Sequence, residues 1–170
     1  RSLIKTNENY TDAAVNFDLT YENINTYFSN DEHDITVLAG FISSDDEGET
    51  TTLGRGGSDY TAAIYANALD AEVLEIWTDV SGMFTANPKL VKQAKPIKEI
   101  SYQEAMELSH FGAKVIFPPT IQPALNKKIP IIIKNTLAPN EEGTLIHKGK
   151  SIKKSAVKGI SHIDDIALLT

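Results

Sequence analysis

The chain has 170 residues, of which 41% are hydrophobic and 23% charged, and its 16 basic and 23 acidic side chains leave a formal net charge of −7. This composition is typical of about one globular domain and excludes collagen-like, coiled-coil and disordered chains. The negative charge argues against nucleic acids and anionic membranes as main partners, and no apolar run is long enough to span a membrane. Because the sequence has no cysteine, disulfides, zinc–thiolate sites, iron–sulfur clusters and thiol catalysis are excluded.

The first fifty residues predict one helix, one strand and one loop. The spacing of the aromatic and aliphatic residues predicts an amphipathic helix over Thr20–Phe28. A largely apolar run at Ile35–Ala39 predicts a buried strand that ends at Gly40. The polar, acidic segment Ser43–Thr52 is expected to be an exposed loop.

Three helices are predicted in the middle of the chain. An alanine-rich helix is expected over Asp59–Leu69. Ser101–Glu104 forms a capping box that begins a second helix, and Gly112 is well placed to end it. The third helix is expected to have Thr120 as its N-cap, because Pro123 is tolerated only in a first turn.

Strands are expected between and after these helices, at Val73–Trp77, Ile129–Ile133 and Gly143–Ile146. Alternating strands and helices predict an α/β fold with a largely parallel sheet. Further strand material is expected at Ala156–Ile160 and Ala167–Leu169, after a basic linker.

The strongest local motif is the sequence Gly-Arg-Gly-Gly-Ser-Asp at Gly54–Asp59. Its glycines let the backbone approach a ligand closely, and the following helix offers N–H groups to an anion. Arg55 carries a guanidinium suited to a carboxylate or phosphate. A simple glycine turn, capped by Ser58 and with Arg55 on the surface, is an equally good interpretation of these residues. A Walker A loop is absent, and the apolar strand of a dinucleotide-binding fingerprint is missing before the loop.

A second motif begins at the end of the predicted strand Val73–Trp77. Thr78 and Asp79 could offer polar contacts there, because ligands of open α/β sheets bind at the carboxyl ends of strands. Phe84 could stack on a base, and Lys89 could contact a phosphate. Considered alone, this segment fits a surface loop better, since Asp and Gly are common turn residues.

The remaining candidates are weak when considered alone. Lys114 follows Gly-Ala and could hold a phosphate, but a solvated lysine explains the local sequence better. The 4 histidines have no partner at the spacing of a metal site, and no G-x-S-x-G nucleophile motif is present.

Together and in this order, the motifs resemble aspartokinases, which belong to the amino acid kinase family. The segments that carry the resemblance are Thr50–Ala62, Ile76–Gly82 with Ala86–Lys89, and Phe111–Lys114, supported by Gly40–Ile42 and Gly143–Leu145. The resemblance covers nearly the whole chain, and the Leu-Gly-Arg-Gly-Gly-Ser-Asp run is specific to aspartokinases. It implies a three-layer α/β/α sandwich of the carbamate kinase type, with a mostly parallel sheet, present here in incomplete form.

The resemblance also implies a role for individual residues. Phe41, Arg55 and Ser58 would contact L-aspartate, and Asp59 would lie at the catalytic centre. The ATP site would contain five residues, namely Thr78, Asp79, Phe84, Lys89 and Lys114. Mg²⁺ would bridge the ATP phosphates with few direct protein ligands. The implied reaction transfers the γ-phosphoryl group of ATP to the side-chain carboxylate of L-aspartate, in the cytoplasmic synthesis of lysine and threonine.

Several features depart from the family pattern. Phe84 replaces a usual tyrosine, Lys89 a common arginine and Phe117 a usual histidine. A phosphate-binding Lys-Phe-Gly-Gly segment is absent from this sequence, and Arg1–Thr6 resembles a stretch from the middle of the kinase domain. The chain is therefore expected to be the C-terminal, nucleotide-binding half of a kinase domain, inactive alone.

The expected domain plan has three parts. Residues 1–147 would belong to the kinase domain, residues 148–154 would be a linker, and residues 155–170 would begin a regulatory ACT domain. ACT domains would make the parent protein a homo-oligomer. Two alternatives remain: an amino acid kinase that acts on acetylglutamate or glutamate, and a non-catalytic module that binds a nucleotide.

Overall fold

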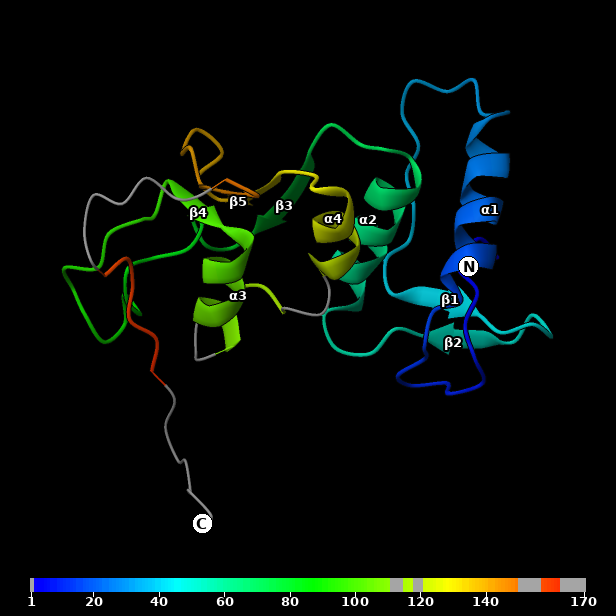
Figure 1. The fold of residues 1–170 in the computed structure, drawn as a ribbon, viewed down its shortest axis with the longest axis horizontal. Coiled ribbons are helices and arrows are strands. Elements are labelled where there is room, and N and C mark those ends of the chain that lie inside the picture. Colours follow the sequence, from blue (N-terminus) through cyan, green and yellow to red (C-terminus); the bar gives the residue numbers. More distant parts are fainter. Residues whose placement is uncertain (1, 111–114, 118–120, 150–156, 163–170) are drawn as a thin grey trace, which may run out of the picture. The chain divides into compact units, whose positions relative to one another are not determined.

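A computed structural model describes residues 2–110, 115–117, 121–149 and 157–162 of the chain (Figure 1). The chain divides into two compact units. Unit 1 comprises Arg1–Leu74 with Pro119–Ile129, and unit 2 comprises Glu75–Pro118 with Pro130–Thr170. Within the described ranges, no helix is both long enough and apolar enough to cross a membrane.

Unit 1 consists of three helices and a β-hairpin. The helices are α1 (Phe17–Phe28), α2 (Gly57–Ala68) and α4 (Gln122–Lys127). The strands β1 (Ile42–Ser44) and β2 (Thr50–Thr52) pair in antiparallel fashion. Helix α2 packs against both α1 and α4, and its buried side chains complete a core of five residues: Ile4, Ile24, Leu53, Ile64 and Ala68.

The first helix begins earlier than the apolar spacing predicted. Asn16 is its N-cap and accepts a hydrogen bond from the Leu19 N–H at 3.3 Å, so the helix starts at Phe17. Thr20, the predicted start, is a buried residue inside the helix, and its hydroxyl accepts a hydrogen bond from the Lys5 N–H at 3.0 Å. The prediction missed this because a capping amide satisfies helix N–H groups without any apolar signal.

The predictions for residues 35–52 were wrong. Ile35–Ala39 forms no strand, and Val37 is 91% exposed. A strand requires a neighbour in its hydrogen-bond ladder, and no described segment pairs with this one. The predicted loop Ser43–Thr52 contains the β1–β2 hairpin instead. Ser43 and Thr51 of this hairpin are buried, and their hydroxyls have partners: Thr51 Oγ1 lies 2.8 Å from Ser43 Oγ and 2.6 Å from Thr6 Oγ1.

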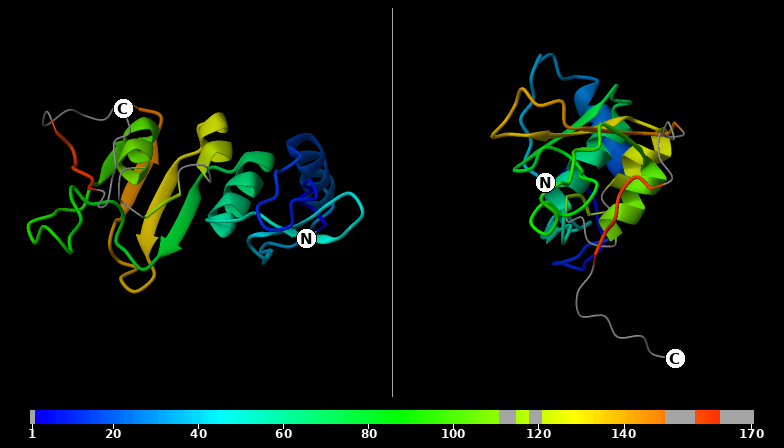
Figure 2. Two further views of the ribbon diagram at one scale, coloured as in Figure 1. Left: turned by 90° about the horizontal axis from the view of Figure 1, so that it is seen from below. Right: turned by 90° about the vertical axis from the view of Figure 1, so that its left-hand side faces the viewer.

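Unit 2 is built on a four-stranded sheet in the order β3-β5-β6-β4. The strands are β3 (Leu74–Thr78), β4 (Glu99–Ser101), β5 (Ile131–Asn135) and β6 (Thr144–His147). Strands β4 and β6 are parallel and β5 and β6 antiparallel, while Figure 2 shows β3 and β5 pointing the same way. Helix α3 (Tyr102–His110) packs on β4 and β6.

The predicted α/β class and mostly parallel sheet are confirmed. The strands predicted at residues 73–77, 129–133 and 143–146 are present with bounds shifted by one or two residues. The sheet core is formed by isoleucines that are fully buried: Ile100, Ile131, Ile133 and Ile146. Strand β4 was not predicted, since a three-residue strand has too little periodicity to detect.

Helix termini were predicted with mixed success. The capping box at the start of α3 is confirmed: the Ser101 N–H donates to Glu104 Oε2 at 3.0 Å, and the Glu104 N–H donates to Ser101 Oγ at 3.2 Å. Pro123 lies in the first turn of α4, as expected, but Ile121 occupies the N-cap position without a side-chain hydrogen bond. Thr120 and the predicted helix end at Gly112 lie outside the described residues.

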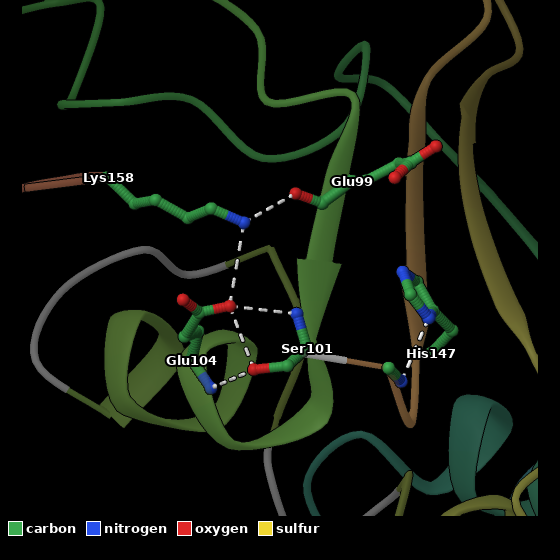
Figure 3. A network of polar contacts seen from close by, with 6 residues as sticks. Glu99, Ser101, Glu104, His147 and Lys158 are labelled. Atoms are coloured by element: carbon green, nitrogen blue, oxygen red, sulfur yellow. Dashed lines mark hydrogen bonds and ion pairs between the residues drawn. The ribbon is translucent and has the colours of Figure 1, made fainter. Parts of the chain in front are cut away.

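The described part of the C-terminal segment, residues 157–162, is held against residues 85–104 of unit 2 by side-chain and backbone contacts. Lys158 Nζ donates to the Glu99 carbonyl at 2.9 Å and lies 3.6 Å from Glu104 Oε2 (Figure 3). The Ile160 N–H donates to the Thr85 carbonyl at 2.8 Å. Residues 157–160 form no strand, contrary to prediction, because one backbone hydrogen bond does not make a ladder. The strand predicted at residues 167–169 lies outside the described residues.

The pKa of Glu104 shows the balance of forces in this contact network. Burial of the carboxyl group raises its pKa, but the hydrogen bonds from Ser101 and the charge of Lys158 outweigh burial and lower the pKa overall. The ionised carboxylate therefore serves two purposes. It caps α3 and it binds the lysine of the C-terminal segment.

A buried hydrogen bond between α2 and α4 provides a test of the packing in unit 1. Asn67 Nδ2 donates to the Pro123 carbonyl at 2.6 Å. Substitution Asn67→Ala leaves this buried oxygen without its donor and is expected to lower the free energy of unfolding by about 1–3 kcal/mol. Urea denaturation followed by circular dichroism measures the change. The control is Asn126→Ala, which removes an exposed amide from α4 and should cost less than about 0.5 kcal/mol.

Candidate functional site

The glycine-rich loop of unit 1 makes a tight turn directly into α2. Gly54 and Gly56 have φ angles of 68° and 70°, in the left-handed region that favours glycine. A Cβ atom on Gly54 would also lie only 3.1 Å from Asp12 Cγ, so the loop lies against the carboxylate of Asp12. The close packing explains why glycine is required in this turn.

Helix α2 begins without a side-chain cap among the described residues. Its N-cap is Gly56, and Ser58 is the second residue of the helix. The alternative interpretation, in which Ser58 caps the helix, is therefore wrong, because the left-handed glycine turn starts the helix at Gly57, two residues earlier than a Ser58 cap would. Ser58 is exposed, and its hydroxyl is not used as a cap. The uncapped first turn leaves N–H groups and the positive end of the helix dipole available to an anion.

The segment before β1 lies directly against the start of α2. A Cβ atom on Gly40 would lie 2.9 Å from Ser58 Cβ, and one on Gly57 would lie 2.8 Å from Phe41 Cβ. Both distances are shorter than real Cβ contacts, so only glycine permits this approach. The structure thus brings Phe41 and Ser58 together, although 17 residues separate them in the chain.

Charged residues flank this contact on both sides. Arg55 is exposed in the turn, and Asp59 is half-buried in the first turn of α2. Burial raises the pKa of the Asp59 carboxyl above its usual value. The four candidate residues of unit 1 are therefore all placed at or next to one helix N-terminus: Phe41 lies against Gly57, Arg55 precedes the helix, and Ser58 and Asp59 are in its first turn.

Thr61 is a residue of this region that the sequence did not single out. It is buried, its hydroxyl accepts a hydrogen bond from the Phe41 N–H at 2.9 Å, and it donates to the Gly57 carbonyl at 2.8 Å. A threonine four residues after a helix start often bonds back to the first carbonyl. That spacing was the only available signal, because the contact with Phe41 joins residues far apart in sequence.

The candidate nucleotide residues of unit 2 begin at the end of β3. Thr78 is the last residue of the strand, and its hydroxyl donates to Asp79 Oδ1 at 3.2 Å. Asp79 is exposed beyond the strand end. The following turn is tied to β5, because Asn135 Nδ2 donates to Ser81 Oγ at 2.9 Å. The arrangement leaves the Asp79 carboxylate accessible to a ligand.

Phe84 lies in a loop that is fixed by backbone hydrogen bonds. It forms a bridge with Pro96, and the Ile97 N–H donates to the Met83 carbonyl at 2.8 Å. Buried Thr144 of β6 ties this loop to the sheet: its hydroxyl accepts from the Met83 N–H at 2.8 Å and donates to the Ile97 carbonyl at 2.6 Å. Phe84 itself is partly exposed.

Lys89 is exposed in a separate turn of this loop, where its N–H donates to Asn87 Oδ1 at 3.0 Å. Lys114 lies outside the described residues, so the structure places only four of the five predicted nucleotide residues. A basic residue that the sequence did not indicate, Lys134 of β5, lies 4.8 Å from the ring of Trp77 near the end of β3. Lys134 therefore places a positive charge near the end of β3.

An open hollow of about 520 Å³ lies elsewhere in unit 1 and is lined by the polar and acidic residues Thr6–Asn9 and Asp45–Glu47. None of the predicted site residues lines it. Within the described ranges, no group of three or more His, Cys, Asp or Glu residues is arranged to hold a metal ion. The candidate ligand-binding residues are therefore those at the start of α2 and those that follow β3.

Comparisons with known proteins establish the family. Residues 3–135 match the model of the amino acid kinase family, which is most of the chain. The chain belongs to the amino acid kinase family. Its resemblance to aspartokinases is confirmed by its relatives. The bifunctional aspartokinase/homoserine dehydrogenase of Buchnera aphidicola is 45% identical over 168 residues, covering 99% of this chain and 20% of that protein.

Further similarity comes from Escherichia coli proteins. The lysine-sensitive aspartokinase 3 is 49% identical over 112 residues, covering 66% of this chain and 25% of that protein. The crystal structure of E. coli aspartokinase III in complex with aspartate and ADP has a TM-score of 0.83 and 39% identity, over 89% of this chain and 34% of that one. These matches confirm the predicted fold class of this member of the amino acid kinase family. The chain spans between a fifth and about a third of the length of these relatives.

Burial of Asp59 predicts a pH-dependent effect on stability. Burial raises the pKa of this carboxyl in the folded protein, so folding favours its protonated form. This contribution to stability is complete below the unfolded pKa of about 3.9, and it is lost as the pH rises through the folded pKa. Substitution Asp59→Asn should therefore raise the free energy of unfolding at pH 7, and the gain should vanish near pH 3.

Urea denaturation of both proteins between pH 3 and pH 7 measures this difference. Asp46→Asn, in the turn of the β1–β2 hairpin, is the control for losing one exposed negative charge. A gain for Asp59→Asn that is the same at both pH values would contradict the prediction.

Proposed function

We propose that this chain supplies aspartate-binding and nucleotide-binding residues of an aspartate kinase. The reaction transfers the γ-phosphoryl group of ATP to the side-chain carboxylate of L-aspartate and yields 4-phospho-L-aspartate and ADP. The observation that carries the proposal is the grouping of Phe41, Arg55, Ser58 and Asp59 at the start of α2. Its support is the similarity to an aspartokinase whose structure contains aspartate and ADP.

The proposed aspartate site uses the anion-binding features of the first turn of α2. The guanidinium of Arg55 can form two parallel hydrogen bonds with one carboxylate of the substrate. The hydroxyl of Ser58 and the uncapped N–H groups of the helix can bind oxygen atoms beside it. Phe41 lies against the same turn and would limit the length of the amino acid that fits. A short dicarboxylic amino acid suits this combination.

Asp59 is proposed to lie at the catalytic centre. Phosphoryl transfer depends mainly on positioning the reactants and on balancing charge around the transferred group. A carboxylate in the first turn of a helix is stabilised by the helix dipole, while burial opposes its charge. From its fixed position on α2, the Asp59 carboxylate can attract a cationic group and hold it beside the transferred phosphoryl group.

The proposed nucleotide site is on unit 2. Thr78 and Asp79 would offer polar contacts at the end of β3, Phe84 a ring for stacking, and Lys89 and Lys114 positive charge for the phosphates. Phenylalanine at position 84 keeps stacking but loses a hydroxyl contact, and lysine at position 89 holds a phosphate as a single charge rather than by a bidentate contact. These differences favour weaker but intact binding of ATP.

Mg²⁺ would neutralise the phosphates of ATP when bound. We propose that this ion is held mainly by the nucleotide's own oxygens, with few direct protein ligands. The chain's own residues then bind and orient the two substrates.

The wider context of the proposal follows the domain plan of residues 1–147, 148–154 and 155–170. We place the kinase activity in the cytoplasmic synthesis of lysine and threonine, with a homo-oligomer formed through ACT domains. The similarity to bifunctional and lysine-sensitive aspartokinases supports this placement in lysine and threonine synthesis. Within unit 2, Lys158 and Ile160 bond to the carbonyls of Glu99 and Thr85, which lie in the proposed kinase part of the chain.

Aspartate binding tests the first half of the proposal. Calorimetry of the 170-residue chain should detect L-aspartate, and Arg55→Gln should weaken that binding at least about tenfold because a charged hydrogen bond is lost. Lys92→Gln, which removes an exposed charge from unit 2, should have no effect. Preference for glutamate or acetylglutamate over aspartate would overturn the proposed acceptor.

Nucleotide binding tests the second half. Asp79→Ala removes the exposed carboxylate at the end of β3 and should lower ATP affinity about tenfold, as expected for one lost polar contact to a ligand. The matched control is Glu141→Ala, which removes another exposed carboxylate from unit 2. Equal ATP affinity in the Asp79 variant and the unsubstituted chain would remove Asp79 from the site.

A further inference from the structure

Phe41 has a strained backbone in the middle of the proposed aspartate site. Its φ angle is 61°, in the left-handed region where bulky residues are rare. Such a conformation costs free energy and persists only where the surrounding structure fixes it. The residue is nevertheless 45% exposed, so its burial does not explain the strain.

The backbone of Phe41 is fixed by two hydrogen bonds to different segments. Its N–H donates to Thr61 Oγ1 at 2.9 Å, and its carbonyl accepts from the Leu53 N–H at 3.0 Å. The Thr61 hydroxyl has one proton, which it donates to the Gly57 carbonyl at 2.8 Å, so its oxygen is left to accept from Phe41. One buried hydroxyl therefore links the strained residue to the first residue of α2.

We propose that Thr61 is a positioning residue for the aspartate site: its hydroxyl holds Phe41 in the left-handed conformation against the first turn of α2. This inference rests on the proposed function, in which Phe41 and Ser58 contact aspartate. Because Gly40 and Gly57 allow contact but do not enforce it, the hydroxyl supplies the directional bond that fixes the distance between the two ligand residues.

Thr61 differs from other buried threonines because its hydroxyl bonds to a residue of the candidate site, Phe41. Thr20 in α1 is also buried, and its hydroxyl also accepts a backbone hydrogen bond, from the Lys5 N–H at 3.0 Å. That bond joins residues that the candidate site does not include. Thr20 is therefore the matched control for losing a buried hydroxyl without disturbing Phe41.

The test compares Thr61→Val, Thr61→Ser and Thr20→Val in the 170-residue chain. Valine has the shape of threonine without the hydroxyl, and serine keeps the hydroxyl. Amide hydrogen exchange of Phe41, followed by NMR, reports on the hydrogen bond directly. Thr61→Val should accelerate this exchange at least about tenfold and weaken L-aspartate binding about tenfold, while leaving ATP binding unchanged.

Thr61→Ser should restore both readouts to within about twofold of the unsubstituted chain, and Thr20→Val should leave both unchanged. If Phe41 exchange and aspartate affinity are the same in Thr61→Val as in the unsubstituted chain, the positioning role of Thr61 is wrong while the proposed function stands. If the unsubstituted chain binds no aspartate, the proposed function fails, and the assignment of Thr61 to an aspartate site fails with it.

Discussion

The candidate aspartate site depends on the close approach of two backbone segments, residues 40–41 and the first turn of α2. A Cβ atom on Gly40 or Gly57 would lie within 3 Å of the opposite segment, so neither position tolerates a side chain without movement. This approach places Phe41 beside Ser58 and gives it a left-handed φ of 61°. Strain in the backbone of Phe41 and the uncapped terminus of α2 are both costs to stability, and both occur where these two segments meet.

Unit 2 uses a similar construction for its candidate nucleotide residues. The loop that carries Phe84 is irregular, but the hydroxyl of buried Thr144 bonds to both of its ends, at the Met83 N–H and at the Ile97 carbonyl. A Cβ atom on Gly82 would lie 2.8 Å from the Thr144 backbone nitrogen, so this loop also packs closely on the strand. In both units a threonine on a regular element fixes a loop that carries the proposed ligand residues. Loops held in this way can vary their ligand residues without losing their shape.

Local sequence predicted the elements whose signals are local. The capping box of Ser101 and Glu104 and the isoleucine-rich β5 are present, because each follows from neighbouring residues alone. The strand expected at Ile35–Ala39 and the hairpin strands missed at residues 42–52 show the opposite case. Thr51 can be buried because Ser43 and Thr6 supply hydrogen-bond partners for its hydroxyl. The composition of a polar segment does not indicate such partners.

The same distinction separates ligand residues from the residues that position them. Arg55, Ser58 and Asp59 stand together in one motif, so a resemblance to a family could indicate them. Thr61 and Thr144 act across 20 and 61 residues of sequence, and only the fold reveals their contacts. The departure at position 84 follows the same logic. Backbone hydrogen bonds on both sides of Phe84 hold its loop, so we expect a phenylalanine in place of tyrosine to lose only the proposed hydroxyl contact and to keep the backbone position of the ring.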